Sequence, residues 1–125
     1  MSFVPATVNL TDTNQILQGA TYVRVFQLKV NGSPQDMTAY DAVPPRCQFR
    51  ASETSGTIVI TPTCAWTSAA TGQFSMTIAA SVTEAFTHPP AVSSGQYDVE
   101  VVADAGGAVE RVMQGTWTIY REITQ

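Results

Sequence analysis

Apolar and polar residues alternate most regularly in the last third of the chain, residues 95–124. The apolar positions begin with Tyr97, Val99, Val101 and Ala103, and the positions between them hold Asp, Glu and other residues. A period of two is what a half-buried antiparallel strand requires, because successive side chains point to opposite faces of the sheet. The pattern predicts three strands, with a hairpin turn at residues 104–107 and a bulge or bend at Gly115.

The same alternation predicts strands earlier in the chain. They span residues 21–30, 46–51, 57–61 and 73–79, with short edge pieces at 16–19 and 65–66. In residues 21–30 apolar groups lie on both faces, so we expect Val23 and Val25 to be covered as well as Tyr22. In residues 109–114 the pattern places Arg111 on the same face as Val109 and Met113.

One short helical turn interrupts the strands. Ser81 followed by Glu84 has the spacing of a capping box, in which the Ser81 side chain starts the helix. Val82 and Phe86 would then face the core, and the proline pair after His88 would end the turn.

These elements predict an all-β protein, an antiparallel immunoglobulin-like β-sandwich of seven to eight strands with one short helical turn. The length suits a single domain, which we place at residues 16–125 after an N-terminal arm of residues 1–15. The Cys…Trp…Cys spacing of immunoglobulins is missing, since Trp66 follows both Cys47 and Cys64. The expected likeness is therefore architectural.

Charge argues against nucleic acid as a partner. The formal net charge is −4, with a single lysine, and the five arginines are scattered among acids, whereas phosphate binding needs clustered cations. Only 13% of residues are charged, about half the usual share, which suits a surface largely covered by neighbours. No apolar run approaches the ~20 residues that span a bilayer, so we expect no membrane partner. The first ten residues do not resemble a signal peptide, so we expect synthesis and folding in a cytosol.

No group of residues predicts catalysis, a metal site or a cofactor. Asp98 and Glu100 lie two apart on one strand, as a glycosidase pair might, but an exposed strand face explains them better. His88 is the only histidine and has no nucleophile or acid placed beside it. In a reducing compartment Cys47 and Cys64 are expected to be buried free thiols, with a disulfide as the alternative. We therefore expect a protein that is not an enzyme.

Binding to another protein is the remaining expectation. The apolar N-terminal arm could dock on a neighbouring subunit. Tyr40 and Trp66 lie in irregular segments where a binding surface is plausible. The charge of Arg111 needs either a partner acid or an interface. The candidate partner-binding residues are Phe3, Val4, Val8, Leu10, Tyr40, Trp66 and Arg111.

Three stretches carry a resemblance to a known family: ILQGATYVRVFQLKVNGSPQDMTAY, then RCQFRASETSGTIVI with GQFSMTIAASVTEAF, and finally GQYDVEVVADAGGAVERVMQGTWTIYREIT. The most distinctive part is the closing pattern GxVxRVxxGxWxIxxEIT. Together they resemble the small immunoglobulin-like β-sandwich domain of tailed-bacteriophage structural proteins, similar to the N-terminal domain of baseplate upper and tail-fibre-attachment proteins.

The resemblance implies a virion structural protein made in the host cytoplasm, a tail, baseplate or fibre-attachment adaptor that contacts other virion proteins and forms a symmetric homo-oligomer. In such relatives a fibre or receptor-binding portion usually follows, whereas this chain stops at Gln125, so we expect a stand-alone adaptor, a tail-tip or baseplate component, or a head decoration protein. The alternatives are a capsid head decoration protein and a carbohydrate-binding module for a host-surface glycan, with Trp66 and Tyr40 as its aromatic platform.

Overall fold

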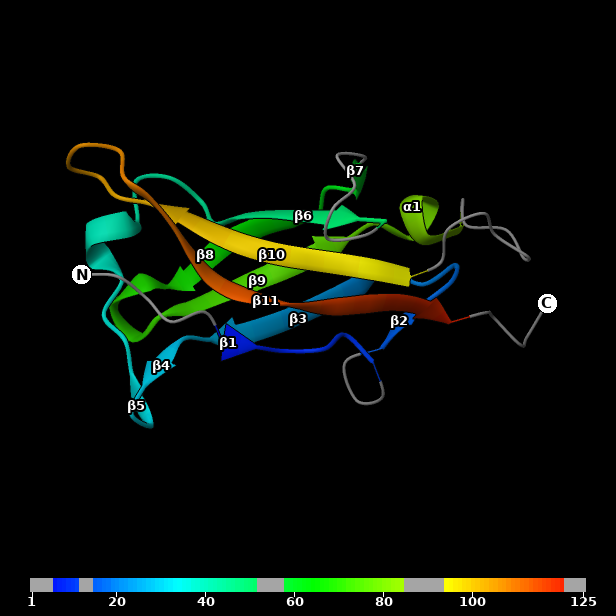
Figure 1. Cartoon of the computed structure of the whole chain (residues 1–125), viewed down its shortest axis with the longest axis horizontal. Coiled ribbons are helices and arrows are strands. Elements are labelled where there is room, and N and C mark those ends of the chain that lie inside the picture. The colour runs from blue at the N-terminus through cyan, green and yellow to red at the C-terminus, as the bar shows by residue number, and fades with distance from the viewer. Residues whose placement is uncertain (1–5, 12–14, 52–57, 85–93, 121–125) are drawn as a thin grey trace.

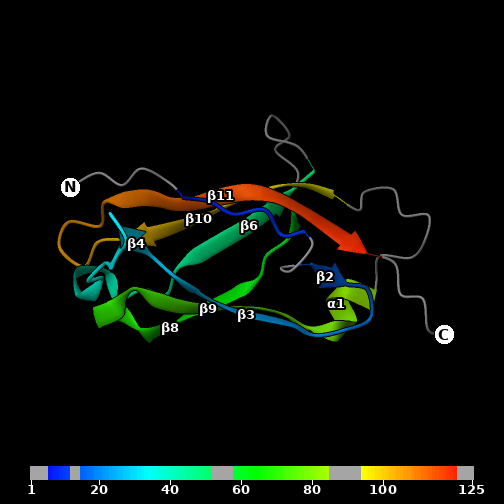
Figure 2. The ribbon, with the colours of Figure 1, turned by 90° about the horizontal axis from the view of Figure 1, so that it is seen from below.

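Two facing β-sheets form the molecule, with their strands running along its long axis (Figures 1 and 2). The computed structural model describes residues 6–11, 15–51, 58–84 and 94–120. The larger sheet has the order β1-β11-β10-β6-β7, with β2 also paired to β11, and the smaller has the order β3-β9-β8. Pairing is antiparallel except for β1 and β2, which run parallel to β11.

The strands of the large sheet are β1 (Ala6–Thr7), β2 (Ile16–Leu17), β6 (Arg46–Arg50), β7 (Ile58–Ile60), β10 (Ser94–Val102) and β11 (Val109–Tyr120). Those of the small sheet are β3 (Tyr22–Gln27), β8 (Thr63–Ser68) and β9 (Gln73–Ile78). A short hairpin joins β4 (Lys29–Val30) to β5 (Ser33–Pro34), and the helical elements are α1 (Ala80–Glu84), η2 (Thr38–Tyr40) and η3 (Ala69–Thr71).

The predicted fold class is confirmed. The chain passes from one sheet to the other between β2 and β3, between β3 and β6, between β7 and β8, and between β9 and β10. This places β6, β10 and β11 side by side opposite β3, β9 and β8, which is the arrangement of strands C, F, G opposite B, E, D in an immunoglobulin-like sandwich. In the described residues, seven strands contain three or more residues, in agreement with the expected number.

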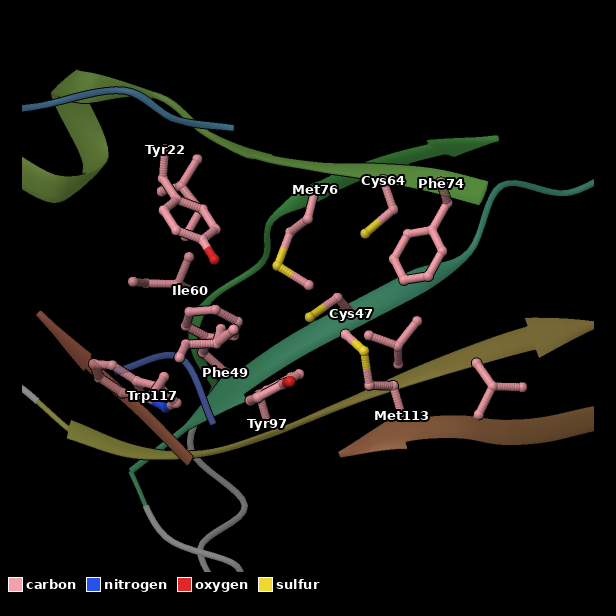
Figure 3. Packing of buried hydrophobic residues seen from close by; sticks show 14 of the residues in the cluster. Tyr22, Cys47, Phe49, Ile60, Cys64, Phe74, Met76, Tyr97, Met113 and Trp117 are labelled. Carbon is pink, nitrogen blue, oxygen red and sulfur yellow. The ribbon is translucent and has the colours of Figure 1, made fainter. Parts of the chain in front are cut away.

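Side chains from both sheets meet in one core (Figure 3). The predicted inward positions Phe74, Met76 and Ile78 of β9 are buried, as are Tyr97, Val99 and Val101 of β10 and Cys47 and Phe49 of β6. Trp117 is fully buried, and its ring stacks on Phe49 with 5.4 Å between the ring centroids. Cys47 on the large sheet and Cys64 on the small sheet are buried free thiols, as expected.

Two further predictions fail in this region: β11 runs unbroken through Gly115, so there are two strands and not three, and the register does not shift at Gly115. The face predicted for Arg111 is also wrong, because the bulge lies directly beside it. The pairing of β10 with β11 shifts between Val99↔Met113 and Glu100↔Arg111, which leaves Val112 as an extra residue. Val112 and Met113 are consequently both buried, and Arg111 turns to the exposed outer face. An extra residue in one strand reverses the alternation beyond it.

Two smaller predictions are also wrong. Val23 and Val25 are not covered, since both point away from the core on the outer face of the small sheet and are more than half exposed. Helix α1 begins at Ala80, with the Ala79 carbonyl accepting from Val82 N, so Ser81 lies inside the first turn.

Within α1 the inward residue is Thr83, not Val82. The Thr83 hydroxyl donates to the Ala20 carbonyl at 2.8 Å, and this hydrogen bond satisfies a buried polar group. Val82 is exposed, and Phe86 lies outside the described residues.

Residues 6–10 lie along β11 as part of the large sheet. Val8 N donates to Gln114 O and Leu10 N to Thr116 O, each at 2.8 Å, and Leu10 is fully buried. Gly115 makes this approach possible, because a Cβ at that position would stand 2.1 Å from the Val8 carbonyl oxygen. Residues 6–10 therefore belong to the sandwich, whereas the sequence suggested an arm that docks on a neighbour.

Candidate interaction faces

The sandwich exposes one charged and one neutral sheet surface. On the outer side of the large sheet, paired residues of β6, β10 and β11 form three rows. The rows are Arg50–Gln96–Thr116, Gln48–Asp98–Gln114 and Arg46–Glu100–Arg111. We call these nine residues the charged face. Their formal charges give +3 from arginine and −2 from the two acids, so this face is net positive on an acidic chain.

Ion pairs link the strands across the charged face. Arg111 Nη2 lies 3.2 Å from Asp98 Oδ2, and Arg46 Nη2 lies 3.5 Å from Glu100 Oε1. The Arg46 side chain is 53% exposed and the Arg111 side chain is 51% exposed. Ion pairs as exposed as these contribute only ~0–1 kcal/mol to stability. These two ion pairs therefore add little to the stability of the fold.

An open depression of about 500 Å³ runs over part of this surface. Thr7 and Asn9 extend its lining beyond the charged face, and the Asn9 side chain accepts from the Thr116 backbone N at 3.2 Å. Amides, guanidinium groups, carboxylates and hydroxyls line the depression, so it offers many hydrogen bonds in several directions.

On the outer side of the small sheet the paired residues form the rows Val23–Thr77–Thr63, Val25–Ser75–Ala65 and Gln27–Gln73–Ser68. We call these nine residues the neutral face. None of them carries a charge, and most have small or β-branched side chains. The two outer faces of the same sandwich thus differ completely in chemistry.

The structure brings Tyr40 and Trp66 together, but it also gives both rings internal partners. Trp66 Nε1 lies 3.0 Å from Tyr40 O and 3.2 Å from Val43 O, and its ring meets Phe74 edge-on. The Tyr40 hydroxyl donates to Glu110 at 3.4 Å. Desolvation and the nearby Glu110 carboxylate raise the pKa of Tyr40. Together these two residues fasten the loop that follows η2 to the sandwich.

The other predicted binding residues have different positions. Of the two alternatives expected for Arg111, a partner acid or an interface, the structure shows an acid, Asp98 on the neighbouring strand. Val8 is half-buried and Leu10 fully buried against the core, so neither side chain is presented to a partner as a free arm would be. Phe3 and Val4 lie outside the described residues.

The charged face is the feature that the sequence analysis missed. Its arginines are far apart in the sequence, and only the pairing of three strands brings Arg46, Arg50 and Arg111 onto one surface. The polar side chains at alternate positions of β6 and β10 indicated that each strand has an exposed face. They did not indicate which strands lie side by side.

Within the described segments no group of three or more His, Cys, Asp or Glu side chains gathers where it could hold a metal ion. No helix in that part of the chain is long and apolar enough to cross a membrane. His88, the single histidine, lies outside it.

Because two tyrosines are buried, we expect the fold to lose stability at alkaline pH. Burial raises the pKa of Tyr22 from 10.0 to about 12, against the opposing effect of Arg24, and burial also raises the pKa of Tyr97. Between about pH 10 and pH 12 the unfolded chain loses phenolic protons that the folded chain keeps, so the free energy of unfolding should fall as pH rises through this window. Below about pH 10 both states hold these protons, so the contribution is fully present there.

Urea unfolding at successive pH values from about 9 to 12 would measure this loss. Tyr22→Phe should lose less stability over the window than the natural chain, because one of the perturbed phenols is gone. An unchanged loss in that variant would contradict the assignment to Tyr22.

No protein-family model matches the chain, and no curated protein matches its sequence. Solved structures do match in fold. One is the NK cell receptor NKp44, described as a triggering partner in natural cytotoxicity. It is 15% identical, the match covers 95% of this chain and 99% of that chain, and the TM-score is 0.42. Similarity at this level is no evidence about function, and the fold assignment rests on the strand order described above.

Proposed function

We propose that this chain is a non-enzymatic structural protein of a bacteriophage virion, a tail, baseplate or fibre-attachment adaptor that acts through protein–protein contacts. The observation that carries the proposal is the charged face, a sheet surface of nine polar side chains that offers hydrogen bonds over an open depression. The sequence resemblance to phage β-sandwich domains supplies the biological setting.

The chemistry of the charged face suits a protein partner. Rows of arginine, glutamine and carboxylate side chains can form many hydrogen bonds with a polar surface, and charged groups of both signs fix the orientation of that surface. The glycan-binding alternative relied on Trp66 and Tyr40 as a stacking platform, and the internal contacts of both rings make them poor candidates for it.

Immunogold labelling of intact particles from the source of this chain tests the proposal, with mass spectrometry of denatured particles as the second measurement. We expect the chain in purified particles and label at the tail end. Label over the head shell would instead identify a decoration protein. Absence of the chain from denatured particles would overturn the virion assignment.

Charge variants test the charged face itself. We expect Arg46→Gln combined with Arg111→Gln to reduce incorporation into particles several-fold while the unfolding midpoint stays nearly unchanged, since both side chains form only exposed ion pairs. Lys29→Gln is the matched control, an exposed cation on β4, outside the charged face. Equal incorporation of the double variant and the control would show that partners bind elsewhere.

A further inference from the structure

Two cysteines enter the core from opposite sheets. Cys47 lies on β6 of the large sheet and is 2% exposed, and Cys64 lies on β8 of the small sheet and is 7% exposed. Figure 3 shows both side chains reaching into the same core, one from each sheet. The chain has only these two cysteines, so a bond between them within one chain would link the two sheets covalently.

The crossover from β7 to β8 brings the two cysteines near each other. β7 pairs with β6 at Phe49↔Ile60, and the chain enters β8 at Thr63, directly before Cys64. Cα atoms of β6 and β8 approach within 8 Å of one another, whereas facing sheets are usually about 10 Å apart. This close approach matters because the two Cα atoms of a disulfide are usually about 4.4–6.8 Å apart.

The two thiols also interact directly. The Cys47 thiol donates a weak hydrogen bond to the Cys64 sulfur. Burial raises the pKa of Cys47, and the hydrogen bond from Cys47 lowers the pKa of Cys64. Cys64 is also the more exposed of the two, and β8 is at the edge of the small sheet. An oxidant should therefore react first with Cys64, because the accessible thiolate is the reactive form.

Two other roles fit this pair less well. Two thiolates supply only half of the four ligands of a structural zinc site, and in the described residues no group of three or more metal-binding side chains gathers. The disulfide of antibody domains joins strands B and F, which correspond to β3 and β10. Those strands contribute Tyr22 and Tyr97 to the core, so a bond between β6 and β8 would have a different position.

We propose that Cys47 and Cys64 form a reversible disulfide that ties β6 to β8 when the chain meets a disulfide oxidant such as glutathione disulfide. The Cys64 thiolate first attacks one glutathione sulfur, which gives a mixed disulfide and releases one glutathione. Cys47 then loses its proton and attacks the Cys64 sulfur, which releases the second glutathione. The two protein thiols give up two electrons and two protons, and one glutathione disulfide becomes two glutathione thiols.

The state of this pair should follow the redox compartment. A reducing cytosol keeps the thiols free, whereas an oxidising medium allows the disulfide to persist. The S–S bond is about 2.05 Å long, so the side chains must rotate toward each other as it forms. It closes a loop of about 15–20 residues and stabilises the fold by restricting the unfolded chain. The bond is a property of the purified chain and does not depend on the virion assignment.

Oxidation of the purified, fully reduced chain with millimolar glutathione disulfide at about pH 8 tests the proposal. After acid quenching and alkylation, intact mass spectrometry should show a monomer about 2 Da lighter that takes up no alkylating reagent. Its thermal midpoint should rise by about 5–10 °C, and dithiothreitol should reverse the rise. The urea-unfolded chain with the same oxidant is the positive control, because both thiols are then accessible.

Cys47→Ala and Cys64→Ala are the matched variants, since each keeps one thiol. Neither should become lighter or more stable with the oxidant. Cys47→Ala should accumulate a glutathione adduct on Cys64, whereas Cys64→Ala should react several-fold more slowly. The proposal is overturned if the folded chain keeps both thiols where the unfolded chain is oxidised. It is also overturned if the bond joins two chains, or if the bridged chain unfolds at a lower temperature than the reduced chain.

Discussion

Trp117→Ala should lower the free energy of unfolding by about 3–5 kcal/mol, the largest effect of a single substitution that we expect in this chain. Trp117 is fully buried, and its indole stacks on Phe49 with an interplanar angle of 20°. Its Nε1 donates to the Arg50 carbonyl at 3.0 Å, which ties β11 to the end of β6 across β10. Alanine removes the packing, leaves a cavity and deprives the Arg50 carbonyl of this donor.

Urea unfolding followed by far-ultraviolet circular dichroism measures this loss, with Trp117→Phe as the control that keeps an aromatic ring but removes the N–H. The phenylalanine variant should fall between the natural chain and the alanine variant. Small domains are stable by only about 5–15 kcal/mol, so the alanine variant should have a greatly lowered midpoint or no cooperative transition. A midpoint within experimental error of the natural chain would show that the ring is not part of the core.

The sequence predicted best where one strand face is buried without interruption. Phe74, Met76 and Ile78 of β9 alternate with polar residues, and all three are in the core. A shift of one residue would turn every one of these side chains to solvent, so the pattern itself determines the orientation of the strand. For a long strand with one covered face, the orientation can therefore be predicted without knowing which strands lie beside it.

The bulge in β11 could not be located in the same way. We predicted the bulge at Gly115 because glycine is frequent at irregular positions in strands. The extra residue is Val112. The glycine is required for another reason, the close approach of the Val8 carbonyl. That approach joins residues more than a hundred positions apart, and local periodicity carries no information about it.

The charged face illustrates the same limit for function. Polar alternation in β6 and β10 predicted that each strand has an exposed side, but the grouping of Arg46, Glu100 and Arg111 depends on which strands pair and in which register. The binding residues chosen from the sequence were mainly aromatic or apolar. Several of them lie in or against the core, because large apolar side chains are more often buried than exposed.

Leu10→Ala should lower the free energy of unfolding by about 2–5 kcal/mol, the range for a fully buried leucine. Leu10 has no exposed surface, pairs with Trp117 across the parallel bridge, and its backbone N donates to Thr116 O at 2.8 Å. The Tyr97 hydroxyl holds the same segment by donating to the Val8 carbonyl. A partner-docking arm would behave differently, because its removal would leave the isolated fold equally stable.

Leu17→Ala is the matched control, since Leu17 is 45% exposed on the neighbouring strand β2, and exposed substitutions usually change stability by no more than ~0.5 kcal/mol. Deletion of residues 1–10 should be at least as destabilising as Leu10→Ala, because it removes Val8 and Leu10 together with their hydrogen bonds to β11. If both the deletion and Leu10→Ala unfold like the control, the segment is an arm after all, and its apolar residues become available to a neighbour. A large loss in both instead means that any failure of the deleted chain to enter particles follows from unfolding and is no evidence for a docking arm.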